Sequence, residues 1–540
     1  MKPERQGYRR AFARTLRRSL GVAAVALAVG ASPSLAQAPK IKEGGTMVVA
    51  LPGDPDSLNA GIVTDISTSN LSGQFYSTIV RQDTEGKVQP YLAESWDISE
   101  DGKTYTFHLF KTIKWHDGVP FTAEDIAWSL WNINKEFNGP ASGLLEAVER
   151  IEAVDDHTVV FHLKYAYPPL LRGLTYFNSS TILPKHIFEG SDPRQNPATY
   201  KPVGTGPFVF KEYVPGSHVI LEKNPDFHLK GQPHLDRLVF QIIPNEAARA
   251  LALEKGEIDY MPYYAISLSD VERLKDVPSV KITVAPRQIA GEYMGFINTR
   301  NGPLSKKEVR QALYYGINRE DLLEKAGFGF GRVSTGPISS EQTVFYTDDV
   351  PHYPYDPAKA EAMLDAAGYP KGPDGKRFSI RVSYDVKEGP MDDTAKLMRL
   401  HLAKIGIDLK IEPLDSNAWR EKSFKNWDFD ITMGSFSTGP DPAIGTERLY
   451  VCRNIAPLFA RNASGYCNPK LDEIFAAAAQ ESDEPKRVEL YHQAQKILAE
   501  DVPHLWLWDR HYPIAFNAKL TGLPAEPTQY GPYDLVGWTE

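Results

Sequence analysis

The chain has 540 residues, of which 42% are hydrophobic and 11% aromatic, and it carries a formal net charge of −9. This composition supports large hydrophobic cores and argues against intrinsic disorder, while the length predicts two or three domains. The acidic balance argues against nucleic acid and against an anionic membrane surface as partners.

The first 36 residues have the order of a secretory signal peptide. Positions 1–18 hold seven basic residues and one acidic residue, an apolar run follows from Leu20 to Val29, and small residues surround Ala36. The apolar run is about half of the roughly 20 residues that a membrane-spanning helix requires. We therefore expect cleavage after Ala36 rather than a transmembrane anchor, which would change the formal net charge to −15. The Arg9-Arg10 pair also resembles a twin-arginine motif, so the Sec and twin-arginine export routes both stay open.

In the first half of the mature chain, short apolar runs are separated by turn residues. Thr122 and Asp125 have the spacing of a helix capping box, and Gly256 follows a helical pattern at the usual stop position. Strands are predicted at 45–51, 104–109, 113–116, 158–163 and 219–221, with 113–116 pairing with 104–109, and helices at 69–80, from 122 onward and at 247–254.

The second half has longer helical patterns between its strands. Helices are predicted at 305–317, 321–326, 358–367, 392–405, 471–480 and 486–501, and strands at 378–384, 407–411 and 429–433. Strands that alternate with helices predict an α/β architecture with mixed sheets.

The two cysteines of the chain, Cys452 and Cys467, lie in one loop-like stretch. In an oxidising compartment an isolated pair this close in sequence is expected to form a disulfide. The rival interpretations are a catalytic cysteine and a metal pair, but no histidine stands beside the cysteines at ligand spacing.

The sequence contains no catalytic signature. It has no Gly-x-Ser-x-Gly elbow, no His-Glu-x-x-His, no Walker loop and no dinucleotide fingerprint. We therefore expect no enzyme, no cofactor and no metal site. A hydrolase with paired carboxylates stays as a remote alternative.

Several motifs, taken together and in order, resemble the family 5 solute-binding proteins, the peptide/nickel-type extracellular subunits of bacterial ABC importers. Their segments are 88–96 (VQPYLAESW), 101–109 (DGKTYTFHL), 114–125 (KWHDGVPFTAED), 203–208 (VGTGPF), 256–259 (GEID), 308–312 (EVRQA), 317–319 (INR), 355–360 (YDPAKA) and 465–469 (GYCNP). The resemblance covers nearly the whole mature chain.

The resemblance implies a periplasmic-binding-protein-like fold of the dipeptide/oligopeptide-binding type, with two hinged lobes and an extra inserted domain. By analogy, lobe I comprises residues 37–79, 200–297 and 513–540, the inserted domain comprises 80–199, and lobe II comprises 298–512. The chain would cross between the lobes near residues 297 and 512, and ligand binding would shift an open–closed equilibrium.

The resemblance also suggests candidate ligand-binding residues. An extended edge that pairs with a peptide backbone corresponds to Thr64, Asp65, Ile66 and Ser67. The positions where dipeptide-binding members place an Asp for the ligand ammonium and an Arg for its carboxylate hold Thr438 and Tyr384, with Asp441, Asp385 or Lys387 as nearby substitutes. The loop residues Ser437 and Gly439 complete this set. Trp419, Trp427 and Phe436 cluster near the loop, where they would either line a pocket or pack in the core.

The function implied is that of a periplasmic solute-binding subunit. It would capture a peptide or peptide-like solute and deliver it, as a monomer, to ABC permease subunits and their ATPase. The departures at Thr438 and Tyr384 argue against a plain zwitterionic dipeptide, because a buried charge needs a partner. An opine, an oligosaccharide or a chelated metal is therefore the alternative ligand.

Overall fold

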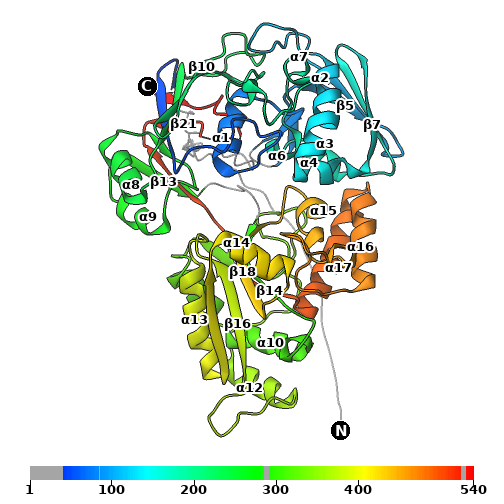
Figure 1. Cartoon of the computed structure of the whole chain (residues 1–540), viewed down its shortest axis with the longest axis vertical. Coiled ribbons are helices and arrows are strands. Elements are labelled where there is room, and N and C mark those ends of the chain that lie inside the picture. Colours follow the sequence, from blue (N-terminus) through cyan, green and yellow to red (C-terminus); the bar gives the residue numbers. More distant parts are fainter. Residues whose placement is uncertain (1–39, 84–85, 285–290, 524–530) are drawn as a thin grey trace, which may run out of the picture. The chain divides into compact units, whose positions relative to one another are not determined.

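The computed structural model describes residues 40–83, 86–284, 291–523 and 531–540 (Figure 1). The predicted signal peptide, residues 1–36, lies outside the described residues. In the part of the chain that is described, no helix has both the length and the apolar character needed to cross a membrane. Residues 41–540 form one compact unit.

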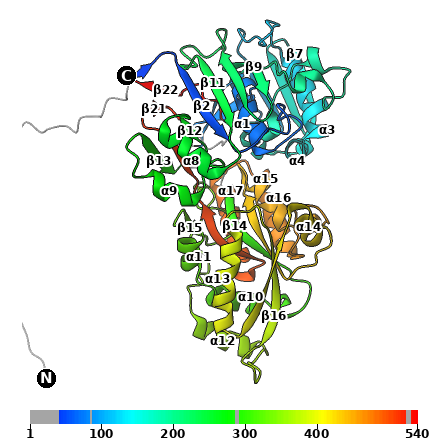
Figure 2. The same cartoon turned by 60° about the vertical axis from the view of Figure 1, so that its left-hand side comes forward.

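A seven-stranded mixed sheet is built around β2, which has parallel neighbours on both sides. Helix α8 at one end of this sheet starts at Asn245, whose side chain accepts a hydrogen bond from the Ala248 N–H at 2.9 Å, and stops at Gly256, which has a positive φ of 73°. The order is β13 (Val280–Val284), β20 (Pro513–Asn517), β12 (Tyr260–Met261), β2 (Thr46–Leu51), β11 (Arg237–Ile242), β10 (His218–Lys223) and β9 (Phe208–Val214), with α1 (Ile66–Phe75), α8 (Glu246–Lys255) and α9 (Leu268–Leu274) packed beside it (Figure 2).

A four-stranded antiparallel sheet has its own core, which includes Phe107, Trp115 and Phe161. Its order is β5 (Ala93–Ile98), β6 (Thr104–Leu109), β8 (Thr158–Leu163) and β7 (Val148–Asp155), and its helices and neighbours are α2 (Ala123–Trp128), α3 (Lys135–Phe137), α4 (Gly139–Leu144), α5 (Pro169–Gly173), α6 (Phe177–Ser180), α7 (Lys185–Phe188) and the pair β3 (Val80–Gln82) and β4 (Val88–Pro90). The capping-box prediction is confirmed, since the Thr122 N–H donates to the Asp125 carboxylate at 3.0 Å.

The predicted pairing of 113–116 with 104–109 is wrong. Both edges of β6 are occupied, by β5 and β8. Residues 113–116 instead turn back on themselves: the Trp115 N–H donates to the Val119 carbonyl and the Gly118 N–H to the Trp115 carbonyl, each at 2.8 Å. This turn places the Trp115 side chain in the core, so its apolar character reflected core packing rather than a strand.

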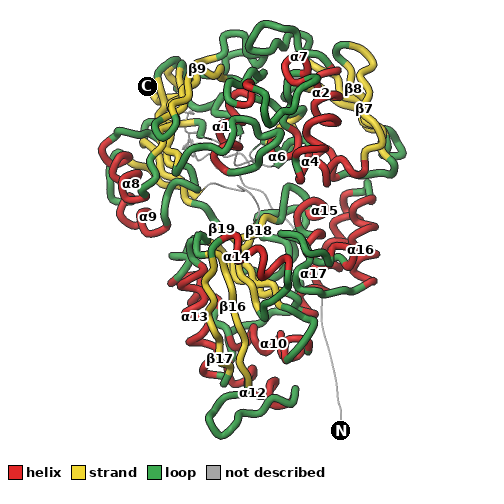
Figure 3. The backbone as a smooth tube through the Cα atoms, in the orientation of Figure 1, coloured by secondary structure: helices red, strands yellow, loops and turns green. Residues whose placement is uncertain are grey.

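A six-stranded mixed sheet occupies the second half of the chain (Figure 3). Its order is β15 (Gly331–Val333), β19 (His504–Arg510), β14 (Gly291–Ile297), β18 (Ile431–Ser437), β16 (Phe378–Asp385) and β17 (Ile407–Leu414); the helices are α10 (Lys307–Gly316), α11 (Arg319–Lys325), α12 (Pro357–Ala366), α13 (Met391–Lys404), α14 (Ser416–Trp419), α15 (Pro442–Gly445), α16 (Pro469–Gln480) and α17 (Glu484–Asp501). A short third sheet joins β1 (Ile41–Lys42), β22 (Gly537–Thr539) and β21 (Leu520–Thr521).

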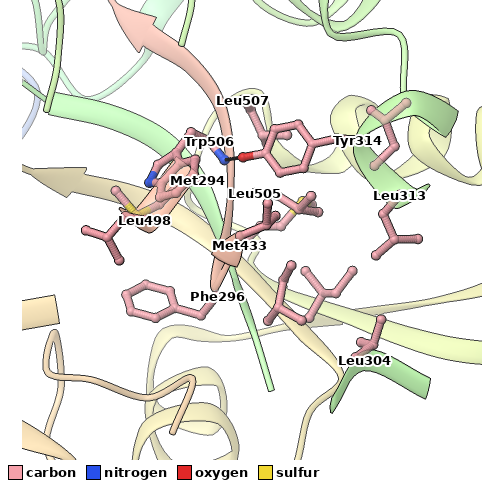
Figure 4. Packing of buried hydrophobic residues seen from close by; sticks show 14 of the residues in the cluster. Met294, Phe296, Leu304, Leu313, Tyr314, Met433, Leu498, Leu505, Trp506 and Leu507 are labelled. Carbon is pink, nitrogen blue, oxygen red and sulfur yellow. Dashed lines mark hydrogen bonds between the residues drawn. The ribbon is translucent and has the colours of Figure 1, made fainter. Parts of the chain in front are cut away.

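The core of the six-stranded sheet is anchored by a polar contact within apolar packing. Figure 4 shows Tyr314 of α10 among leucine, methionine and tryptophan side chains. Its hydroxyl accepts a hydrogen bond from the backbone N–H of Trp506 at 2.6 Å. The same hydroxyl donates to the His504 carbonyl at 3.1 Å. β15 pairs with β19 only from Trp508 to Arg510, so these two bonds satisfy backbone groups of β19 beyond the end of β15.

The chain changes sheets twice. β13 belongs to the seven-stranded sheet and β14 to the six-stranded one, so the first change falls before Gly291 and earlier than the expected position near residue 297. The second falls between β19 and β20, at residues 511–512. The division of residues 41–540 into separate lobes with the expected boundaries stays a prediction.

The two cysteines form a disulfide, Cys452–Cys467, with Cα atoms 4.7 Å apart. Hydrogen bonds also hold the loop between them. The Cys452 N–H donates to the Asp472 carboxylate at 3.1 Å, and the buried Asn462 amide donates to the carbonyls of Tyr450, Val451 and Tyr466.

We expect Cys452→Ser to lower the free energy of unfolding by about 3 kcal/mol, because the closed loop of 15 residues would no longer restrict the unfolded chain. Binding should survive, since the hydrogen bonds from Asn462 still fold the loop. Thermal melts with and without a reductant measure this: the reduced wild type should melt like the variant. Equal melting temperatures for oxidised wild type and variant would contradict the prediction.

Candidate ligand-binding site

The stretch expected to pair with a peptide backbone is only partly extended. Thr64 and Asp65 precede α1, whereas Ile66 and Ser67 are its first helical residues. Asp65 caps the helix by accepting from the Thr68 N–H at 3.0 Å. Its second carboxylate oxygen is buried and has no hydrogen-bond partner among the described residues, and burial raises its pKa. The backbone available for strand addition is therefore limited to Thr64 and Asp65.

Tyr384 on β16 is committed to the protein itself. Its side chain is fully buried in the core of the six-stranded sheet, and its hydroxyl donates to the carboxylate of Asp392, the second residue of α13. Burial and the Asp392 carboxylate raise the pKa of the phenol, so it stays neutral. Tyr384 thus supplies no positive charge at the position where the family pattern has an arginine.

Asp441 is also neutralised internally. It is fully buried, caps α15 through the Ala443 N–H at 3.0 Å, and accepts two hydrogen bonds from the Arg487 guanidinium of α17 at 2.8 and 2.6 Å. A bidentate pair of this kind satisfies both charges. Asp441 is consequently not available as a substitute partner for a ligand ammonium.

The rest of the loop after β18 is held by its backbone. Thr438 is buried with a hydroxyl that has no hydrogen-bond partner in the described part of the chain, and its carbonyl accepts from the Gln342 amide at 3.3 Å. The Gly439 carbonyl accepts from the same amide at 2.7 Å. Gly439 has a φ of 73°, and an added Cβ would lie 2.9 Å from Gly445, so a glycine is required here. The Ser437 hydroxyl accepts from the Gly439 N–H at 3.0 Å.

The aromatic residues near this loop form a cluster with one exposed member. Trp419 and Phe436 are each 3% exposed, and the Trp419 indole donates to the Thr432 hydroxyl at 2.9 Å. Phe424 and Phe459 join them, but Phe459 is 46% exposed. Trp419 and Phe436 are therefore core residues in this structure. Phe459 offers the exposed aromatic ring that was expected from Trp419 or Phe436. The sequence did not indicate Phe459, because its loop has no periodic apolar pattern.

A second group of aromatic residues, which the sequence analysis did not predict, lies where the chain passes from one sheet to the other. The ring of Tyr512, between β19 and β20, lies 4.4 Å from the ring of Tyr263, which follows β12 of the seven-stranded sheet. Tyr293 on β14 packs against Trp508 on β19 with ring centroids 5.0 Å apart. These residues are far apart in sequence and stand in no motif, so only the topology brings them together.

Two acids are buried beside this aromatic group. Glu292 and Asp509 are directly paired across β14 and β19 and are 0% and 1% exposed. Each accepts one serine hydroxyl, from Ser334 at 3.2 Å and from Ser340, and each keeps one carboxylate oxygen without a hydrogen-bond partner in the described residues. Burial, and for Glu292 the neighbouring Asp509, raises the pKa of both groups. In the described residues no group of three or more His, Cys, Asp and Glu could hold a metal ion.

Comparison with known proteins matches this chain to one family along most of its length. Residues 87–456 match the model of the bacterial extracellular solute-binding proteins, family 5 Middle. The oligopeptide-binding protein AppA of Bacillus subtilis is 30% identical over 92% of both chains. Among solved structures, DppA from Helicobacter pylori in complex with the peptide STSA has a TM-score of 0.77 at 27% identity, covering 92% of this chain and 99% of that one. AgaA from A. tumefaciens R10, in complex with agropinic acid, has a TM-score of 0.75 at 25% identity, with 92% and 99% covered. The two-lobed α/β fold expected from the sequence is therefore correct.

We expect Glu292→Gln to remove a pH-dependent loss of stability. Because the folded-state pKa of Glu292 is raised above the unfolded value of about 4.5, folding retains a proton that the unfolded chain releases, and the free energy of unfolding falls as the pH rises above 4.5. The variant cannot ionise there. Its melting temperature should equal that of the wild type near pH 4.5 and exceed it increasingly toward pH 8.

The matched control is Glu473→Gln on the exposed face of α16. Its melting curves should follow the wild type at every pH. Parallel curves for Glu292→Gln and the wild type across this range would show that Glu292 ionises normally in the folded protein.

Proposed function

This chain belongs to the bacterial extracellular solute-binding proteins of family 5, and we propose that it captures a peptide or peptide-like solute and delivers it to the permease of an ABC importer. The observation that carries the proposal is the length of the similarity. An oligopeptide-binding relative aligns over 92% of both chains, so the shared part is the whole solute-binding protein rather than one segment of it.

The ligand is best described as peptide-like rather than as a plain dipeptide. Asp441 is paired with Arg487, and Tyr384 with Asp392, so neither position offers a free charge to a zwitterion. This favours an opine as the second candidate, in line with the similarity to AgaA in complex with agropinic acid. An oligosaccharide would need exposed aromatic rings of the kind that Phe459 offers. A metal would have to arrive with its own chelator, since the described residues contain no metal-binding group.

We further propose that binding is not coupled to turnover. The matched family consists of solute-binding proteins, and Glu292 and Asp509 are sealed in the core rather than placed on either side of a substrate. A hydrolase would convert the bound molecule, whereas a transport receptor releases it unchanged. The protein would work as a periplasmic monomer together with the permease subunits and their ATPase.

The proposal is tested by the thermal melting of residues 37–540 with di- to pentapeptides, opines, oligosaccharides, and nickel with and without histidine. A ligand that binds only the folded state must raise the melting temperature, because at a concentration of 100 Kd it increases the free energy of unfolding by about 2.7 kcal/mol. We expect a shift with peptides. A shift with opines or sugars alone would keep the receptor role and replace the ligand class, and chemical change of a recovered ligand would contradict the transport role.

Export makes a separate prediction. Expressed in a Gram-negative host, the full chain should be recovered from the periplasm with Gln37 as its first residue, because the small side chain of Ala36 suits the signal peptidase. N-terminal sequencing reads this directly. Arg9→Lys together with Arg10→Lys should block export only if the twin-arginine route is used. A mature protein that retains residues 1–36 would mean that the segment is an anchor.

A further inference from the structure

Most of the buried arginines near the six-stranded sheet have hydrogen-bond partners within the described residues. Arg319 donates to the carbonyls of Ser334, Trp506 and Tyr353. Arg310 donates to the carbonyls of Leu304, Ser305, Asp501 and Val502, and Arg487 to the Asp441 carboxylate. Arg510, the last residue of β19, is partly buried; its guanidinium interacts with the Tyr512 hydroxyl, but its buried Nε has no hydrogen-bond partner and the group has no ion pair within 4.0 Å in the described residues.

The Arg510 guanidinium is nevertheless held in one place. Its Cζ lies 4.7 Å from the ring centre of Tyr512 and 5.5 Å from that of Tyr293, both within cation–π distance. On another side it rests against the backbone of Gly291, where an added Cβ would lie only 2.5 Å from Nη2. Two aromatic rings and a glycine therefore fix a planar cation whose buried Nε–H has no hydrogen-bond acceptor among the described residues.

In the described residues no acid forms an ion pair with Arg510 within 4.0 Å, although two acids lie near it. Glu292 is one residue from Gly291, but it is paired with Asp509 across the strands, and burial raises its pKa, which disfavours its charged form. Glu388, in the loop after β16, interacts with Arg510 through space, yet burial raises the pKa of Glu388 as well. Burying a guanidinium is unfavourable unless an anion pairs with it.

We propose that Arg510, flanked by Tyr293 and Tyr512, forms a subsite for a carboxylate of the bound solute. The inference rests on the proposed function, because it names the chemistry that the same receptor recognises. A carboxylate matches the planar fork of a guanidinium with two parallel hydrogen bonds. The subsite supplies the positive charge that Tyr384 does not, and it does so from the segment that joins the two sheets. Tyr263, attached to the seven-stranded sheet, contacts Tyr512 and completes its aromatic border.

The test uses three probes, namely trialanine, trialanine amide and succinate, with wild type and Arg510→Gln in residues 37–540. Calorimetry should show that the wild type prefers the acid to the amide. Arg510→Gln should lower the affinity for trialanine by at least about 30-fold, leave the affinity for the amide nearly unchanged, and abolish the response to succinate. Arg399→Gln, on the exposed face of α13, is the matched control and should leave all three affinities as they are.

A second variant guards against loss of folding. Gly291→Ala keeps every charge but places a methyl group where Nη2 lies, so it should reduce the preference for the acid while the melting temperature confirms a folded protein. Equal affinity for acid and amide in the wild type, or an unchanged preference in Arg510→Gln, overturns the subsite while the receptor role stands. A response to succinate without any response to peptides supports the subsite and removes the peptide assignment. A wild type that responds to neither carboxylate overturns the subsite.

Discussion

The pairing of β14 with β19 is the constraint on which the rest of the molecule depends. The chain changes sheets immediately before β14 and immediately after β19, so the antiparallel ladder between these strands holds both connections side by side. The same ladder aligns Glu292 with Asp509 and brings Gly291 against Arg510. A one-residue slip would turn every one of these side chains to the opposite face of the sheet. The hydrogen bonds between the Tyr314 hydroxyl and the backbone of Trp506 and His504 stabilise this register from inside the core.

Charge satisfaction then decides which residues remain available for a solute. Burying an ion is costly unless a partner accompanies it, and most buried ions here carry that partner with them. Asp441 has Arg487, and Arg319 has three carbonyl groups. These residues shape the loop after β18 and the adjoining helices, and they have no remaining capacity for a ligand. Recognition is left to groups whose donors or acceptors the described residues do not use, and the Arg510 Nε is such a donor.

Local signals in the sequence predicted much of the fold. Strands 104–109 and 158–163 occur at the expected residues, and the helix start at Thr122 and the helix stop at Gly256 follow capping chemistry that acts within a few residues. The segment at 113–116 failed because its apolar residues serve a tight turn packed on the core, which local pattern does not distinguish from a strand. Trp419 could not be assigned between pocket and core, because its indole partner, Thr432, lies on β18 and only the packing of α14 on β16 and β17 brings the two residues together. Arg510 and Tyr263 are about 250 positions apart in sequence, and no short-range signal reports such a juxtaposition.

An acidic protein that selects a carboxylate is physically consistent. The formal net charge of −9 is spread over the surface, and salt at physiological strength screens such charges beyond about 8 Å. Inside the protein that screening is weak, so the nearest fixed charge governs the local potential. Burial raises the pKa values of Glu292 and Glu388, and this weakens their competition with a solute carboxylate for Arg510. Stability and affinity are therefore linked at this site. Ionising either acid would lower the stability of the folded protein and would also lower the affinity of Arg510 for a solute carboxylate.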